Sequence, residues 1–217
     1  MFSYKQILYI FEEILFMRAV DAIKTRRSVK HFDPKHKLSD AEVEDLLSLA
    51  ILSPTAFNIQ NWRYVIVSDP ALRQQIQDSA DGQVQITESS LLVVLCADLM
   101  AWDKAPQQYW QDSPEDIQNI MVPMISQFFS GNAQLQRDEA MRSCGIAAQT
   151  LMIAAKSMGY DSCPMDGFDF ERVAELIRLP DDHIISMFVV IGKALQPARS
   201  RPGQLPLNSV RVDNTFS

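Results

Sequence analysis

The stretch that decides the fold reads Thr-Arg-Arg-Ser-Val-Lys at residues 25–30, and it is complemented by Ser-Pro-Thr-Ala-Phe-Asn-Ile-Gln-Asn-Trp at residues 53–62. The first segment places three cations and a hydroxyl within five residues, and the second offers side-chain amides around a proline turn. Arginine and lysine form charge-assisted bonds with phosphate, and amides suit the polar edge of a flat heterocycle. The two segments therefore suit a ligand that has both parts, as flavin mononucleotide (FMN) does.

The composition indicates one compact acidic domain with a local excess of positive charge. A chain of 217 residues with 47% hydrophobic residues is long enough to bury a core as one domain or as one subunit of a dimer. The net charge of -7 argues against a general binder of nucleic acid or anionic membranes, because those partners attract basic surfaces. Residues 24–37 nevertheless carry six lysines or arginines and one acid, Asp33, which favours a small anionic ligand.

The three cysteines, Cys96, Cys144 and Cys163, are odd in number and widely spaced. This pattern supports neither a disulfide framework nor a zinc ribbon. We therefore expect no metal site, and we expect the protein to work in a reducing cytoplasm.

Residues 1–16 form an apolar segment that Glu12 and Glu13 interrupt. The apolar run is too short to span a membrane and no small-residue cleavage site follows it, which disfavours a secretory signal. An extra amphipathic helix and a start codon placed upstream of a native start at Met17 both stay open. We expect residues 17–217 to form a single domain.

Cap signals and apolar periodicity predict alternating helices and strands. Ser39 and Glu42 form a capping-box signature, and Asp69–Pro70 and Asp169 are further helix starts. The apolar run at residues 91–96 is typical of a fully buried central strand. The other expected elements are a helix ending at residue 24, strands at 64–67 and 184–191, a largely buried helix at 137–158, an irregular loop at 161–168, an insertion or lid at 101–131, and an extended tail from residue 196.

The seven glycines form neither a GxGxxG motif nor a P-loop, which excludes the usual sequence routes to binding of dinucleotides or nucleotide triphosphates. A phosphate must then be held by side chains. Arg26, Arg27 and Ser28 are the candidates, joined by Arg199 and Arg201 from the tail. The residues alone leave open a simpler alternative, in which a solvated basic turn and a basic tail bind nothing.

Several motifs resemble, in order and spacing, the nitroreductase family of FMN flavoproteins. They are residues 26–33, residues 53–62 and residues 164–169, supported by the helix end at 154–160 and the strand end at 191–193. The resemblance covers roughly residues 19–212. It implies an α+β fold in which a central mixed β-sheet is flanked by helices, and an intertwined homodimer with FMN bound at the interface.

Carried over by position, the resemblance implies a cofactor site built by both subunits. Arg26, Arg27 and Ser28 would meet the phosphate together with Arg199 and Arg201. Lys30 would lie near the pyrimidine end of the ring, where its charge favours the anionic reduced flavin. The partner subunit would contribute Pro54, Thr55, Ala56, Asn58 and Gln60, and the ring edge and one ring face would meet Gln83, Gln85, Pro164, Met165, Asp166 and Gly167.

Asp166 departs from the family pattern, because many relatives have glutamate at this place. If a main-chain amide of the loop meets the flavin N5, the shorter acid is tolerated. If the carboxylate orders a ligand or water instead, that role is in doubt.

The implied reaction needs no catalytic side chain, because the cofactor carries hydride chemistry and the protein positions donor and acceptor over one ring face. NAD(P)H would act first and a nitroaromatic or a quinone would follow at the same site, which is a ping-pong cycle. Trp102, Tyr109, Phe128 and Phe129 are the candidates for the wall of the acceptor pocket. Ordinary packing is the alternative for each of these rings.

Two other functions stay open on the same resemblance. One is action on the flavin itself or on a halogenated aromatic, and the other is flavin binding without catalysis. His31, His36 and His183 are expected to be solvated or structural, because no acidic or serine partner lies at motif spacing from them. Cys163 is expected to be an inert packed thiol.

Overall fold

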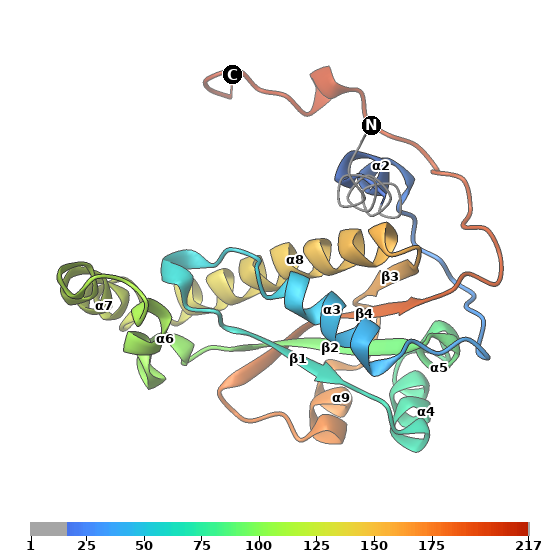
Figure 1. Cartoon of the computed structure of the whole chain (residues 1–217), viewed down its shortest axis with the longest axis horizontal. Helices are drawn as coiled ribbons and strands as arrows, with labels where there is room; N and C mark the ends of the chain where they lie inside the picture. The colour runs from blue at the N-terminus through green and yellow to red at the C-terminus, as the bar shows by residue number, and fades with distance from the viewer. Residues whose placement is uncertain (1–16, 217) are drawn as a thin grey trace, which may run out of the picture.

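The computed structural model describes residues 17–216, in which helices cover both faces of a four-stranded sheet (Figure 1). The expectations for residues 1–16 lie outside this part of the chain. The strands are β1 (Trp62–Ile66), β2 (Leu91–Asp98), β3 (Asp161–Met165) and β4 (His183–Gly192). The sheet order is β1-β2-β4-β3, so the two longer strands lie at the centre, and the prediction of a buried central strand at 91–96 is confirmed.

The sheet is antiparallel rather than mixed, which corrects one detail of the expected fold. All three strand pairs run antiparallel. The connection from β1 to β2 through α4 and α5, and that from β3 to β4 through α9, each leave and re-enter the sheet at the same end. The parallel pairing found among residues 17–216 is an isolated bridge between Ser28 and Ser162.

Two apolar cores lie on the two faces of the sheet, as the alternation along β2 requires. Leu91, Val93 and Leu95 belong to the core that includes side chains of α3 (Asp40–Ala50) and α8 (Ala133–Ser157). Leu92 and Val94 belong to the core on the opposite face. Figure 1 shows that face covered by α4 (Pro70–Asp78), α5 (Gln85–Glu88) and α9 (Phe170–Ile177).

The predicted helix starts are confirmed by their hydrogen bonds. The Glu42 N–H donates to Ser39 Oγ at 3.3 Å and the Ser39 N–H donates to Glu42 Oε2 at 2.8 Å, which completes the capping box of α3. Asp69 and Asp169 accept from main-chain N–H groups in the first turns of α4 and α9. Gly159, with φ of +79°, follows the end of α8 as expected.

The irregular loop expected at residues 161–168 is wrong for its first part, because Asp161–Met165 forms β3. Its serine, proline and aspartate have low strand propensity, but pairing with the apolar β4 overrides that preference. Pro164, opposite Val189, is compatible with β3 because β3 is an outer strand of the sheet.

The expected insertion at residues 101–131 folds as α6 (Ala101–Lys104), the 3-10 turn η2 (Pro106–Trp110) and α7 (Glu115–Phe129). Together with η1 (Ala56–Asn58) these elements enclose a third small apolar cluster around Ile59 and Ile125. In Figure 1 α6 and α7 lie at the left end of the sheet, whereas α5 lies at the right end and α2 lies above α8.

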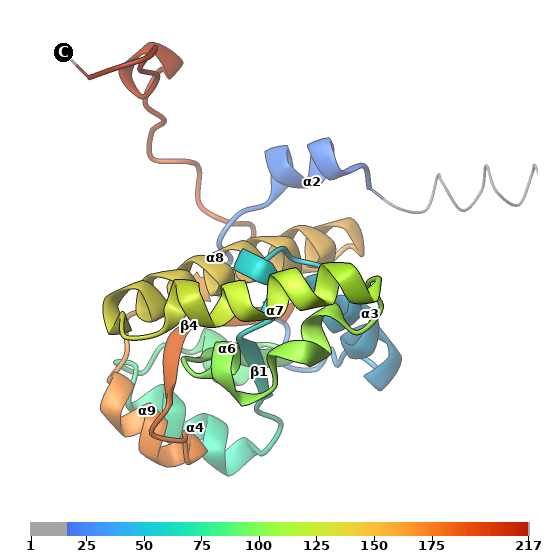
Figure 2. The same cartoon turned by 90° about the vertical axis from the view of Figure 1, so that its left-hand side faces the viewer.

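The two ends of the described chain lie outside the sheet. The helix α2 (Ala19–Thr25) packs against α8, and the tail after β4 runs exposed and extended except for η3 (Leu207–Ser209). Figure 2 shows the tail leaving the body of the molecule on the side of α2. Within residues 17–216 we find no helix with the length and apolarity needed to cross a bilayer.

Candidate functional site

A cavity of about 540 Å³ lies where the segment after α2, the turn into α5 and the C-terminal tail meet. Eight of the residues expected to bind the cofactor line it: Arg26, Arg27, Ser28, Lys30, Gln83, Gln85, Arg199 and Arg201. Ser200, Pro202 and Gly203 complete the lining and had no signal in the sequence. Its volume falls within the range of about 300–1,000 Å³ that is common for small-molecule sites.

Pairing with the sheet sets the direction of the basic segment. The Val29 N–H donates to the Ser162 carbonyl at 3.1 Å, next to the bridge between Ser28 and Ser162. Val29 is buried, whereas its neighbours Ser28 and Lys30 are exposed and line the cavity. The extended backbone thus turns one apolar side chain into the core and two polar side chains toward the cavity.

Hydrogen bonds between arginines and carbonyls close the cavity on the side of the tail. Arg27 Nη2 donates to the Arg199 carbonyl at 2.5 Å. In the other direction, Arg201 Nη2 donates to the carbonyls of Arg26 and Lys24 at 3.2 and 3.4 Å. The tail is therefore fastened to the segment after α2 although more than 170 residues separate them.

The charge of the cavity is not balanced by other residues of the described chain. None of its five cations, Arg26, Arg27, Lys30, Arg199 and Arg201, forms a salt bridge within residues 17–216. Arg26 Nη1 is buried and has no hydrogen-bond partner in the described chain. A buried donor without an acceptor is costly, so this geometry favours a bound anion.

Lys30 contacts the thiol of Cys163, with 3.5 Å between Nζ and Sγ. Burial raises the pKa of the Cys163 thiol, and the neighbouring Lys30, Ser28 and Arg26 oppose that shift. The raised pKa favours the protonated thiol of this buried side chain, and its inertness stays a prediction.

The two glutamines connect the cavity to the segment after β3. Gln85 Nε2 donates to Gln83 Oε1 at 2.9 Å, and Gln83 Nε2 donates to the Gly167 carbonyl at 2.9 Å. Asp166 and Gly167 are exposed beside this contact, whereas Pro164 and Met165 belong to β3. The segment 164–167 thus lies next to the cavity without lining it.

The residues expected from the partner subunit lie elsewhere in this chain. None of Pro54, Thr55, Ala56, Asn58 and Gln60 lines the cavity. Of these residues, Ala56 packs in the apolar cluster with Tyr109, and Asn58 Nδ2 donates to the Tyr109 carbonyl at 2.8 Å. A single subunit therefore does not unite the two halves of the predicted site, and their union across a dimer stays a prediction.

The four aromatic residues proposed for the acceptor pocket do not line the cavity of their own chain. Trp102 and Phe129 are buried, with 6.3 Å between their ring centroids, and Tyr109 packs against the same cluster. Within one subunit these three rings therefore pack in an apolar cluster and do not form the wall of the cavity. Phe128 differs, because 42% of its surface is exposed.

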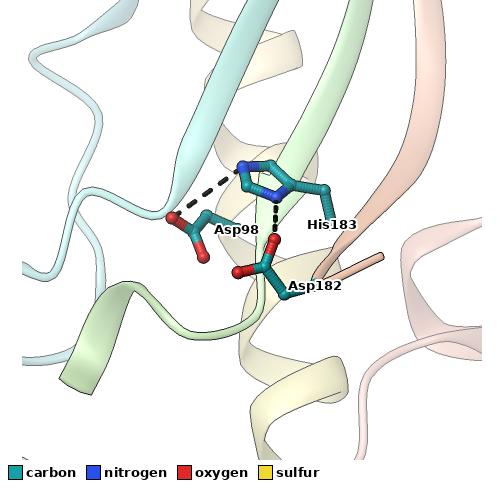
Figure 3. A group of neighbouring side chains, drawn as sticks. All are labelled: Asp98, Asp182 and His183. Atoms are coloured by element: carbon teal, nitrogen blue, oxygen red, sulfur yellow. Dashed lines mark hydrogen bonds and ion pairs between the residues drawn. The ribbon is translucent and has the colours of Figure 1, made fainter. Parts of the chain in front are cut away.

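A second polar cluster, which the sequence did not indicate, lies at the opposite end of the sheet. Figure 3 shows Asp98, at the end of β2, together with Asp182 and His183 at the start of β4. His183 Nδ1 lies 2.6 Å from Asp182 Oδ1, and His183 Nε2 lies 3.8 Å from Asp98 Oδ2. Potential ligand atoms of these three residues lie close enough together to hold a metal ion.

Cations of the protein already occupy this cluster. Lys104 Nζ lies 2.8 Å from carboxylate oxygens of both Asp98 and Asp182, and Arg63 Nη2 lies 3.1 Å from Asp98 Oδ2. The bond from Lys104, followed by that from His183, lowers the pKa of Asp182 to about 2. A metal would have to displace Lys104, so we interpret the cluster as an ion-pair network, with His183 in the structural role expected of it.

Comparisons with known proteins find a matching family model and similar relatives. The sequence model of the family described as "Nitroreductase family" matches residues 23–193. "Protein DrgA" of Synechocystis is 50% identical over 199 residues, which covers 89% of this chain and 95% of that protein. "Putative NAD(P)H nitroreductase YodC" of Bacillus subtilis is 32% identical, covering 88% of this chain and 96% of that protein.

Solved structures share the fold. A crystal structure described as a putative nitroreductase in complex with FMN, from Exiguobacterium sibiricum, superposes with a TM-score of 0.85 at 25% identity. The match covers 91% of this chain and 98% of that one. The arrangement of the sheet and its helices is therefore shared with a protein whose crystal structure contains FMN.

Proposed function

The chain belongs to the nitroreductase family, and we propose that it is an FMN-dependent oxidoreductase that passes hydride from NAD(P)H to nitroaromatics or quinones. The names of its relatives support an NAD(P)H-dependent oxidoreductase, and one structural neighbour contains FMN. The proposal assigns a ping-pong cycle, in which donor and acceptor use one site in turn. The three free thiols favour the cytoplasm as the place of action.

The observation that carries the proposal is the unbalanced positive charge of the cavity. Five cations line it without a carboxylate partner in the described chain, and Nη1 of one of them, Arg26, is buried with no hydrogen-bond partner there. A phosphate monoester offers the acceptor oxygens that such donors lack. The ribityl phosphate of FMN is the anion that we assign to this place.

The residues that would hold FMN form groups that differ in the part of the cofactor they would contact. Arg26, Arg27, Ser28, Arg199 and Arg201 would bind the phosphate, and Lys30 would favour negative charge at the pyrimidine end of the ring. Gln83 and Gln85 would hold the ring edge, and Pro164, Met165, Asp166 and Gly167 would cover one face. Bound FMN would supply the hydride chemistry, while these side chains bind and orient it.

A homodimer completes the proposed site. The partner subunit would bring Pro54, Thr55, Ala56, Asn58 and Gln60 to the ring, and Phe128 to the acceptor pocket. Exposed apolar side chains on α3 and α7 support burial against a second copy, since such surfaces mark interfaces. They are Leu49 on α3, Ile51 and Leu52 just after it, and Ile117, Ile120, Met124 and Phe128 on α7.

The purified protein tests the proposal directly. It should be a yellow dimer that loses its visible absorbance on addition of NADH or NADPH and regains it with menadione or a nitrobenzene derivative. Fragmentation of free reduced flavin under oxygen would instead favour action on the flavin itself. A protein that stays colourless and cannot be reconstituted with FMN would contradict the proposal.

A further inference from the structure

The turn formed by residues 56–60 has a strained backbone. Phe57, Asn58 and Gln60 have φ of 53°, 56° and 43°, which is the left-handed region that side chains with a Cβ atom rarely adopt. No other stretch of five residues within 17–216 holds as many non-glycine residues of this kind. Strain of this type persists only where neighbouring structure holds it in place.

Two reciprocal hydrogen bonds join the turn to η2. Trp110 Nε1 donates to the Phe57 carbonyl at 3.0 Å, and Asn58 Nδ2 donates to the Tyr109 carbonyl at 2.8 Å. In each bond a side chain of one segment reaches the main chain of the other. The ring of Phe57 also packs against Phe128, with 5.1 Å between centroids. The two segments therefore fix each other's shape.

The 3-10 turn η2 is itself fastened to the sheet. Tyr109 Oη donates to the Ala101 carbonyl at 3.0 Å, which ties η2 to α6. At the end of α6, Lys104 is paired with the buried Asp98 of β2 at 2.8 Å. The strained turn is thus connected through η2 and α6 to a central strand.

The turn leaves one of its two amide side chains free. The Gln60 N–H donates to Thr55 Oγ1 at 3.0 Å, but the Gln60 side-chain amide makes no hydrogen bond within residues 17–216. The Asn58 amide nitrogen is already used by Tyr109. Of the two amides expected at the flavin, Gln60 is therefore the one available to a ligand.

We propose that Trp110 is a positioning residue for the cofactor. By holding residues 56–60 in their strained shape, its indole N–H presents Thr55 and Gln60 to the FMN bound with the partner subunit. Trp110 itself touches no cofactor. This inference rests on the proposed function, and it gives the helical segment 101–131 a role in cofactor binding that the expected acceptor pocket does not include.

The test compares Trp110→Phe with Trp62→Phe in the full-length flavoprotein. Both changes replace an indole, but Trp62 Nε1 is buried without a partner in the described chain, in the core beside α8. Trp110→Phe removes the donor to Phe57. The Kd for FMN is measured by quenching of flavin fluorescence, alongside the unfolding midpoint of the apoprotein and the oligomeric state. One lost hydrogen bond predicts a Kd about tenfold higher for Trp110→Phe, and an unchanged Kd for Trp62→Phe.

A second variant tests whether Trp110 acts through Gln60. Gln60→Ala removes the free amide and no hydrogen bond within residues 17–216, so it should raise the Kd by itself, and Trp110→Phe should then add little to it. Gln60→Ala also serves if Trp110→Phe alone does not fold. Equal Kd values for the two tryptophan variants, or an unchanged Kd in Gln60→Ala, would overturn the inference. Wild-type protein that binds no FMN would overturn the proposed function instead.

Discussion

Arg201 donates a hydrogen bond from Nη2 to the main-chain carbonyl of Arg26 at 3.2 Å, so the tail and the segment after α2 meet at one cavity. This bond leaves the charge of both guanidinium groups uncompensated, because a carbonyl carries no net charge. The contact therefore gathers positive charge around the cavity without neutralising it, as a site for a phosphate requires.

Removal of two donors should weaken FMN binding. In Arg26→Ala/Ser28→Ala the phosphate would lose a guanidinium and a hydroxyl. Hydrogen bonds to charged groups contribute about 1.5–3 kcal/mol each, so we expect the Kd to rise by at least about a hundredfold. An FMN titration of the apoprotein measures it. Arg211→Ala is the control, because Arg211 pairs with Asp213 and does not line the cavity. An unchanged Kd in the double variant would refute the phosphate assignment.

Loss of the charge of Lys30 should lower the flavin midpoint potential. A cation near the pyrimidine end stabilises the anionic reduced form, so Lys30→Met should make reduction harder. Because Lys30 is exposed and water screens its charge, we expect a drop on the order of 30 mV, which is about 1.4 kcal/mol for a two-electron couple. Spectroelectrochemical titration gives the potential, with Lys35→Met as the control from the same basic segment. No drop would count against the placement of Lys30.

Glu42 should make the free energy of unfolding depend on pH in the acid range. The hydrogen bond from Tyr160, together with those from Ser39, lowers the pKa of Glu42 from 4.5 to about 2. The unfolded chain therefore takes up this proton at higher pH than the folded chain does. The contribution of Glu42 is complete above pH 4.5 and is lost as the pH falls toward 2.

Unfolding midpoints measured from pH 6 to pH 2 should consequently fall less steeply in Glu42→Gln than in the wild type. Glu44→Gln is the matched control on α3, since the Glu44 side chain makes no hydrogen bond or ion pair with other residues of 17–216. Parallel curves for the wild type and Glu42→Gln would show that Tyr160 and Ser39 do not favour the charged form of Glu42.

In the ion-pair network at the other end of the sheet, substitution of Asp98 should lower the free energy of unfolding more than substitution of Asp182. The Asp98 side chain is 2% exposed and meets both Arg63 and Lys104, whereas that of Asp182 is 37% exposed. Asp98→Asn would leave cations without their buried partner. Because those cations are partly solvated, we expect a loss of about 2 kcal/mol rather than the larger cost of a fully buried pair. Urea unfolding measures it, and a greater loss in Asp182→Asn would contradict the assignment.

Local signals were enough to predict most elements of the fold. Ser39 with Glu42, Asp69 with Pro70, and Asp169 each predict a helix start through a hydrogen bond that the neighbouring residues themselves supply. The strand β3 was missed because its stability comes from β4, which is remote in sequence. Its residues carry little strand preference of their own.

The candidate site was likewise predictable from the sequence only in part. Residue types alone identified the cations that gather around the cavity. They did not indicate that Trp102 and Phe129 would stack in a separate cluster, because an aromatic ring in a pocket and one in a core look alike in sequence. The family resemblance supplied the residues at 54–60, whose proposed contact with a cofactor would depend on a second subunit.

Arg27 and Arg201 join segments from opposite ends of the described chain, so the cavity can be completed only late in synthesis. Synthesis runs from the N-terminus, so the strands, α8 and the basic segment all leave the ribosome before the residues that close the cavity. The cavity is therefore completed last, after translation has passed Gly203. A prematurely terminated product that retains the whole sheet would still lack one wall of this pocket.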